Sequence, residues 1–346
     1  MWFGYHISEL YSPFSTIKKI VGVFAEKHYN FDLKSFYNLN LGLPYEDPMS
    51  KQIEFTHLEN KRDFTFNLGN IPDDILYLVS GTDQQLDRLE TTIIGITDNE
   101  KKIYVLDHRS HFGIDCTKVE SPVYQELSNF LNQPFKTVSG REVPLLGSFI
   151  DSSNGNATDT IYRISYKFAS RQGKRLFTPI KGAPSGSNGH PLFKKTKTEG
   201  KEHWNLNVNL GKDNIYRLIQ QCLVDPDDTD KTQIYFTATL PDDYFMQLTS
   251  EVRVLKSGNY FWEKKLSGER NESLDCLCYA LICNKWVQAN LAVNGRNPFH
   301  ELRLYTENRG KLTNISTETI QPKPQANLIK PQQNLLGSRP RGIRFT

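Results

Sequence analysis

The amino-acid sequence predicts one mixed α/β domain, with a lead-in segment before it and a basic tail after it. Two patterns predict this fold class. Strand-length apolar runs rich in Val, Ile and Tyr begin near residue 75, and helically spaced apolar segments separate the later runs. With 38% hydrophobic residues in a chain of 346, a substantial core can form.

The first three predicted strands form an antiparallel meander. They span residues 75–83, 89–97 and 102–110, and the turn sequence "DNEKK" separates the last two. Because the connections are short, each strand is expected to pair with the one before it. The sheet therefore begins with an antiparallel part.

Helices and strands alternate after this meander. In order, they are a helix in residues 120–135, a strand at 143–151, a helix in 157–172 and a strand at 175–182. The order β-β-β-α-β-α-β predicts a mixed sheet flanked by helices, which is the order of the RNase H-like core. Two more helices are predicted, one within residues 209–223 and a long one across 271–291.

Both flanks of this domain have their own composition. The first segment, residues 1–70, is predicted to be a lead-in that contains a helix in residues 12–27 with Ser12 as its N-cap. The RNase H-like domain is predicted to span residues 71–300. The last segment, residues 301–346, is predicted to be a flexible, Pro-rich tail. The net charge is +3, yet the residues from 310 onward carry six basic side chains and one acid. We therefore expect a body near neutrality with a basic appendage.

Composition also limits the classes of protein to which the chain can belong. No run of eighteen apolar residues occurs, so no membrane span is predicted. The five cysteines are odd in number and three lie within residues 276–283 without a zinc-ligand spacing. We expect small core residues rather than disulfides or a zinc site, and a reduced, intracellular protein.

Three aspartates stand where chemistry is expected. Asp83 ends the first strand, Asp151 ends the fourth, and Asp275 lies early in the last long helix. In the RNase H-like order the first and fourth strands are parallel neighbours, so their ends bring the acids together. Three close carboxylates need a cation, and oxygen ligands select Mg²⁺ or Mn²⁺, as a pair of ions in phosphodiester hydrolysis. The alternatives are turn formers for the strand acids and a solvated helix face for Asp275.

Several segments, taken in order, resemble one family. They are "GTDQQLDRLE", "FIDSSNG", "PIKG", "NLGKDNIYRL", "LTSEVRV" and "RNESLDCLCYAL". Together they resemble the lambda-type phage terminase large subunit, the GpA family, from about residue 3 to 290. This resemblance implies a metal-dependent nuclease that cuts concatemeric DNA during genome packaging, with Asp83, Asp151 and Asp275 as ligands of two Mg²⁺ or Mn²⁺ ions.

The same resemblance assigns roles to two lysines, and the composition of a nearby loop suggests further DNA contacts. Lys212 in "GKD" and Lys181 in "IKG" match lysines of the family, and either could hold the scissile phosphate. Further DNA contacts are expected from lysines of the loop or hairpin in residues 183–203, namely Lys194, Lys195 and Lys197. Ordinary solvated lysines are the alternative for all of them.

Other candidates have weaker support. Glu272 lies one helical turn before Asp275 and is a further candidate metal ligand. Asp87 is either an outer residue of the site, a turn residue, or the ion-pair partner of its neighbour Arg88. His190 and His203 are expected to be surface residues.

The resemblance has one large gap, because no G-x-x-x-x-G-K-[ST] phosphate loop occurs. We therefore expect no ATP hydrolysis, and either a separate ATPase motor chain or a missing N-terminal half. The other expected partners are double-stranded DNA, a terminase small subunit, and a portal bound by the tail, all in the host cytoplasm and without a membrane. A structure-specific nuclease on the same core and a non-catalytic assembly module remain alternatives.

Overall fold

The computed structural model of the chain describes residues 7–29, 35–43, 53–183, 190–198, 200–224, 228, 230–256, 259–292 and 297–307. The chain divides into a unit Met1–Thr313 and a unit Asn314–Thr346. The second unit, with most of the predicted basic tail, lies outside the described residues. No helix in the described ranges combines the length and the apolar character needed to cross a bilayer.

The described part of the chain contains a nine-stranded mixed sheet with the order β1-β11-β4-β3-β2-β7-β8-β10-β9. Its centre consists of β2 (Ile75–Gln84), β3 (Arg88–Thr97), β4 (Lys102–Phe112), β7 (Leu145–Asp151) and β8 (Thr178–Gly182). The first three are antiparallel, whereas β7 is parallel to β2 and β8 is parallel to β7. This confirms the predicted RNase H-like arrangement.

Four strands extend the sheet at its two edges. They are β1 (Arg62–Asp63) and β11 (Gln233–Thr237) beyond β4, and β10 (Lys201–Leu206) and β9 (Phe193–Thr198) beyond β8. The antiparallel pair β9 and β10 is the hairpin that was one of two predictions for residues 183–203. The short strands β1 and β11 were not predicted, because neither has an alternating pattern long enough to indicate a strand.

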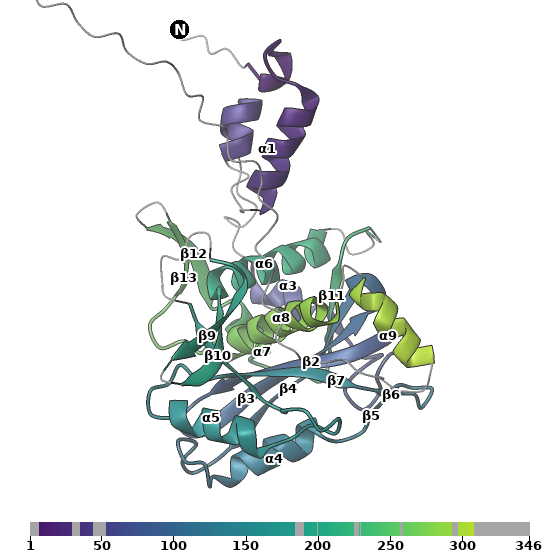
Figure 1. Cartoon of the computed structure of the whole chain (residues 1–346), viewed down its shortest axis with the longest axis vertical. Helices are drawn as coiled ribbons and strands as arrows, with labels where there is room; N and C mark the ends of the chain where they lie inside the picture. The colour runs from purple at the N-terminus through teal and green to yellow at the C-terminus, as the bar shows by residue number, and fades with distance from the viewer. Residues whose placement is uncertain are drawn as a thin grey trace, which may run out of the picture. The chain divides into compact units, whose positions relative to one another are not determined.

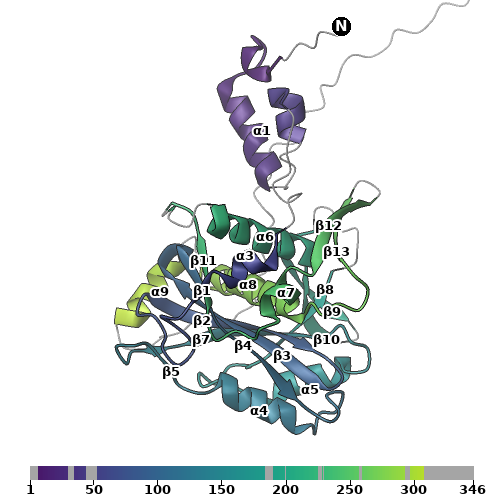
Figure 2. The same cartoon turned by 180° about the vertical axis from the view of Figure 1, so that it is seen from behind.

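Helices cover both faces of the sheet. On one face lie α6 (Val208–Val224), α7 (Tyr244–Leu248), α8 (Glu272–Leu291) and α9 (Pro298–Glu307), and on the other α4 (Pro122–Leu131) and α5 (Thr158–Lys167). Figures 1 and 2 show α6 and α8 on the side of the sheet opposite to α4 and α5. Most residues of α8 are buried, on all sides of the helix, because its apolar residues are not confined to one face as they are in an amphipathic helix.

Glycines allow α8 to lie unusually close to the sheet. A Cβ atom on Gly81 of β2 would lie 2.3 Å from the carbonyl oxygen of Cys276 in α8. A Cβ on Gly147 of β7 would lie 2.6 Å from Sγ of Cys283, further along the same helix. Any larger residue at Gly81 would push the helix backbone away, because backbone atoms cannot turn aside as a flexible side chain can.

The segment before the sheet differs in detail from the prediction. It contains η1 (Glu9–Tyr11), α1 (Ile17–Tyr29) and η2 (Phe36–Leu41). The predicted N-cap at Ser12 is wrong, since Ser12 ends η1 and the hydroxyl of Thr16 accepts from the backbone N–H of Lys19, 3.2 Å away. The sequence "SPF" therefore forms a turn rather than the first turn of the helix.

The sheet domain extends beyond the predicted boundaries at 70 and 300. Leu58 of α3 (Phe55–Glu59) and Phe66 are buried, and α9 packs against β2 and α8. Shorter elements complete the described structure: η4 (Asp98–Glu100), the pair β5 (Phe135–Lys136) and β6 (Glu142–Val143), and the hairpin β12 (Glu251–Lys256) with β13 (Asn259–Lys264).

Candidate active site

The ends of β2 and β7 bring two aspartates side by side. The parallel register pairs Thr82 with Ile150, so the next residues along the strands, Asp83 and Asp151, are neighbours. Both are buried, and the paired antiparallel strand places Glu90 of β3 on the other side of Asp83. The predicted meeting of the two strand ends is therefore present in the fold.

Helix α8 adds the third aspartate. Because Gly81 lies against Cys276, the preceding residue, Asp275, is held above the end of β2. Burial raises the pKa of Asp83 well above its ordinary value, and the charges of Asp275 and Asp151 raise it further. Burial also raises the pKa of Asp151 and of Asp275, and the charge of Asp275 adds to the effect on Asp151. The three carboxylates thus share one poorly solvated region.

Each of these carboxylates has its own hydrogen-bond donors. Gln85 donates to Asp83, while Ser153 donates its backbone N–H and its hydroxyl to Asp151 at 3.0 and 2.7 Å. In the described part of the chain, no three His, Cys, Asp or Glu side chains form a group that could hold a metal ion as they stand. The all-oxygen donor set and its uncompensated charge nevertheless fit a hard divalent cation, which would take the place of some of these donors.

Asp275 is surrounded by Lys212 and by Glu251, a glutamate that was not among the predicted site residues. Nζ of Lys212 lies 2.8 Å from Oδ1 of Asp275 and 2.7 Å from Oε1 of Glu251. Although burial lowers the pKa of Lys212, the charges of Asp275 and Glu251 outweigh it and raise that pKa. The segment "LTSEVRV" contains Glu251, but only the fold shows that this acid is buried.

Glu272 lies in a different network. Its carboxylate accepts from Arg88 at 3.1 Å and from Arg270 at 3.2 Å, and both arginines also bind Glu90, at 2.8 and 2.7 Å. The four side chains form a closed ring of alternating charge that joins β3 to the start of α8. Since both Glu272 oxygens accept from arginine, this geometry gives no support to the expectation of a metal ligand.

Neighbours of this ring follow the same pattern. Asp87 is exposed and pairs with Arg88 at 2.9 Å, which was one of its predicted roles. Burial alone would raise the pKa of Glu90, but hydrogen bonds from His108, Ser110 and Arg88 lower it to about 2. Glu90 is therefore a fixed negative charge beside the aspartates.

The predicted DNA-binding lysines lie toward one edge of the sheet. Lys181 is on β8, and Lys194, Lys195 and Lys197 are on the edge strand β9. Register pairs Asp151 with Ile180, Ile180 with Trp204 and Trp204 with Lys195, so one row across the sheet runs from the site to this edge. Lys195 pairs with Glu202 at 3.0 Å, whereas Lys194 and Lys197 are exposed.

The histidine and cysteine expectations have different outcomes. His203 is buried, with its Nδ1 2.8 Å from the hydroxyl of Tyr162, so the expected surface position is wrong; β10 directs this side chain toward α5. His190 is partly exposed. The five cysteines are free thiols and all are buried, as expected for core residues.

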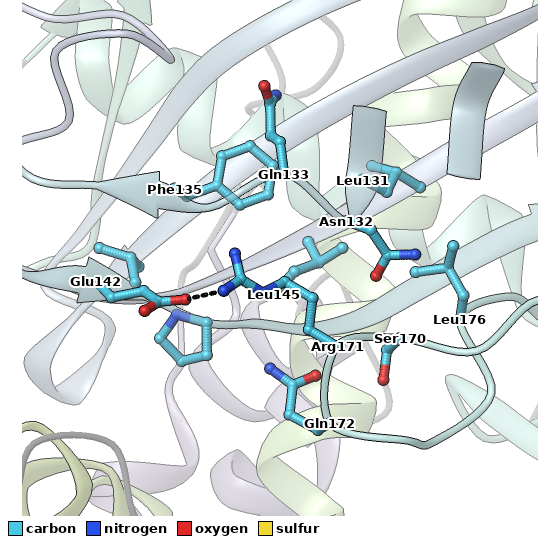
Figure 3. A pocket seen from close by; sticks show the side chains of 12 residues that line it. Leu131, Asn132, Gln133, Phe135, Glu142, Leu145, Ser170, Arg171, Gln172 and Leu176 are labelled. Atoms are coloured by element: carbon cyan, nitrogen blue, oxygen red, sulfur yellow. Dashed lines mark ion pairs between the residues drawn. The ribbon is translucent and has the colours of Figure 1, made fainter. Parts of the chain in front are cut away.

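A pocket on the α4 side of the sheet contains none of these residues. It is lined by residues at the end of α4, by residues 142–145 and by the loop around Arg171, whose guanidinium lies 3.0 Å from a carboxylate oxygen of Glu142 (Figure 3). Because the aspartates lie on the α8 side, this pocket is not part of the candidate site.

Comparison with known proteins identifies similar chains. Residues 2–294 match the family model "Terminase large subunit gpA, endonuclease domain". The chain is 26% identical over 306 residues to the terminase large subunit of Enterobacteria phage P21, covering 84% of this chain and 45% of that protein. It is 25% identical over 287 residues to the terminase large subunit of Escherichia phage lambda, covering 80% and 42%. The chain thus spans less than half the length of either relative.

A solved structure also matches. It is the crystal structure of the large terminase nuclease from thermophilic phage G20c with bound magnesium, with a TM-score of 0.36 and 11% sequence identity. The match covers 65% of this chain and 94% of that one.

Proposed function

This chain belongs to the family of terminase large subunit gpA endonuclease domains, and from that premise we propose that it is a metal-dependent endonuclease that cuts concatemeric DNA during phage genome packaging. The observation that carries the proposal is the group of three aspartates at the ends of β2 and β7 and the start of α8, namely the buried Asp83 and Asp151 and the partly buried Asp275. Carboxylates whose pKa values are raised by burial and mutual charge are a signature of functional sites.

Two Mg²⁺ or Mn²⁺ ions are the proposed cofactors, held by the three aspartates. Bound there, such ions supply an activated water and stabilise the leaving oxygen. The chain itself positions the three carboxylates: the strand ends fix Asp83 and Asp151, and α8 fixes Asp275 beside them. Lys212 keeps a positive charge at the site, where it can stabilise the growing charge of the scissile phosphate.

The DNA path proposed here leads from the aspartates toward the β9 edge. Lys181, Lys194, Lys195 and Lys197 occupy this side of the sheet, and lysines bind phosphates without regard to sequence. The proposed partners are double-stranded DNA, a terminase small subunit that supplies sequence recognition, an ATPase motor, and a portal. The segment proposed for the portal is the basic tail, and apart from residues 301–307, which belong to α9, it lies outside the described residues.

Plasmid cleavage in Mg²⁺ or Mn²⁺ tests the activity. We expect the wild-type chain to nick or linearise the plasmid, and the Asp83→Ala/Asp151→Ala chain to lose at least about a hundredfold of that rate, as for loss of central catalytic groups. Asp159→Asn is the matched control, because Asp159 is an exposed acid in the first turn of α5. Cleavage that survives the double substitution would disprove the assignment, and a strong preference for branched over linear duplex would favour a structure-specific nuclease.

A further inference from the structure

Glu251 lies within one of the segments that resemble the family, but it has no role in the proposed catalysis, and it is central to a closed set of contacts. Its carboxylate accepts from Lys212 through both oxygens, at 2.7 and 2.8 Å, and from Nδ2 of Asn271 at 2.7 Å. Both donors also bind Asp275, Lys212 at 2.8 Å and Asn271 at 2.9 Å. Two acids therefore share the same two donors.

The two acids of this set differ in access to solvent. The side chain of Asp275 is 18% exposed, but those of Glu251 and Lys212 are only 4% and 7% exposed. A cation arriving from solvent can therefore reach Asp275 and is shielded from Glu251. The hydroxyl of Tyr216 donates to the backbone carbonyl of Glu251 at 2.9 Å, which fixes this residue at the start of β12.

Binding of a cation to Asp275 would remove one of the two carboxylates that compensate the charge of Lys212. The lysine and the cation carry the same sign of charge, and both use Asp275. A buried ammonium that loses its only carboxylate is costly, so a lysine without a second partner would compete with the cation for Asp275. Glu251 removes this competition, since its two oxygens already hold Nζ of Lys212.

We propose that Glu251 is a positioning residue that holds Lys212 in place when Asp275 binds a divalent cation instead of Lys212. This inference rests on the proposed nuclease function. Glu251 acts on the ion only through Lys212 and is not itself a ligand. It keeps the ammonium charged, desolvated and fixed beside the aspartates, where a phosphate would meet it.

A double-mutant cycle with calorimetric Mn²⁺ titration of the full, metal-free chain tests the proposal. We expect Glu251→Gln to weaken Mn²⁺ binding about tenfold or more, as for loss of a residue that supports a metal ligand. In a Lys212→Gln background, where no ammonium competes, the same change should weaken binding by less than about threefold. Equal weakening in both backgrounds would make Glu251 a direct ligand or a plain charge, and no weakening in either would leave it without a role; either result overturns the proposal.

Further variants keep this test decisive. Glu251→Asp retains the charge but shortens the side chain, so its contact with Lys212 is lost and Mn²⁺ binding should weaken nearly as much as in Glu251→Gln. If Lys212→Gln does not fold, as judged by thermal unfolding, an unchanged Mn²⁺ affinity in Glu251→Asp would still overturn the proposal. Glu263→Gln, an exposed acid on the same hairpin, is the control and should change nothing.

Failure of the inference and failure of the proposed function give different results. If the wild-type chain cleaves DNA and Asp83→Ala/Asp151→Ala does not, the proposed nuclease function is supported. The double-mutant cycle then tests only the role of Glu251. If the wild-type chain neither binds Mn²⁺ nor cleaves DNA, the proposed function is contradicted, and so is the role of Glu251 that depends on it.

Discussion

At the scale of single residues, the acids around the strand ends differ in how their charge is compensated. Glu90 and Glu272 share two arginines, and Glu251 and Asp275 share Lys212 and Asn271. The donors found for Asp83 and Asp151 among the described residues are the neutral groups of Gln85 and Ser153. The uncompensated negative charge is therefore concentrated on the two strand acids, which is where a cation would be attracted most strongly.

The raised pKa of Asp83 leads to a prediction about stability. Burial makes its ionised form unfavourable in the folded state, so in metal-free protein at neutral pH this acid costs stability. Asp83→Asn should therefore raise the thermal midpoint of the metal-free chain by a few degrees, on the scale of about 1–2 kcal/mol. The same variant should lose the gain in midpoint that Mn²⁺ gives the wild-type chain. Thermal unfolding with and without Mn²⁺ measures both, and a lower metal-free midpoint for Asp83→Asn would contradict the reasoning.

Glu90 leads to the opposite dependence on pH. Its pKa is about 2 in the folded chain, below the ordinary 4.5, so its ionised form stabilises the fold. This contribution, on the order of 3 kcal/mol at most, is fully present above pH 4.5 and is lost as the pH falls toward 2. Glu90→Gln should thus be less stable at pH 7, with a smaller loss of stability between pH 4.5 and 2 than the wild type. Denaturant unfolding across this pH range is the measurement, and parallel curves for the two chains would show that Glu90 is not responsible.

At the scale of elements, the position of α8 decides whether the aspartates form one site. The helix crosses β2, β3 and β7, and the ring of Glu90, Arg88, Glu272 and Arg270 ties its first turn to β3. Gly81 supplies the clearance over β2. The sequence predicted this helix and its aspartate, but it did not predict the close approach, because a glycine within a strand has several explanations.

Gly81→Ala tests the importance of that approach. The added Cβ would lie 2.3 Å from a backbone oxygen of α8, so the helix must shift. We expect a loss of roughly 1–3 kcal/mol in stability, as for overpacking, and a larger fractional loss of Mn²⁺-dependent cleavage as Asp275 moves from Asp83. Gly22→Ala is the matched control, because a Cβ there meets no atom within 4 Å. Wild-type cleavage and stability in Gly81→Ala would show that α8 can adjust without moving the site.

At the scale of the whole molecule, the sequence predicted the elements whose own residues carry a clear apolar pattern. It did not predict the elements and contacts that depend on residues far away in the sequence. Strands β2, β3, β4 and β7 have long apolar runs, β8 has a shorter one, and the order of these strands predicted that Asp83 and Asp151 meet. The short strand β11 is stabilised by pairing with β4 and β1 rather than by its own sequence pattern. Glu251 was missed for a similar reason: its burial depends on α6 and α8, which are distant in sequence.

The extent of the sheet domain can be tested by removing residues from its start. Leu58 and Phe66 are buried in the domain, and Arg62 donates to the carbonyl oxygens of Leu240 and Pro241 at 2.6 and 2.9 Å. Deletion of residues 1–70 would remove these contacts and the β1 edge, whereas deletion of residues 1–52 would keep them. Since buried Leu and Phe side chains contribute roughly 2–5 kcal/mol each, the shorter protein should unfold at a much lower temperature or fail to fold. Equal thermal midpoints and equal cleavage for the two truncated proteins would instead place residues 53–70 outside the folded domain.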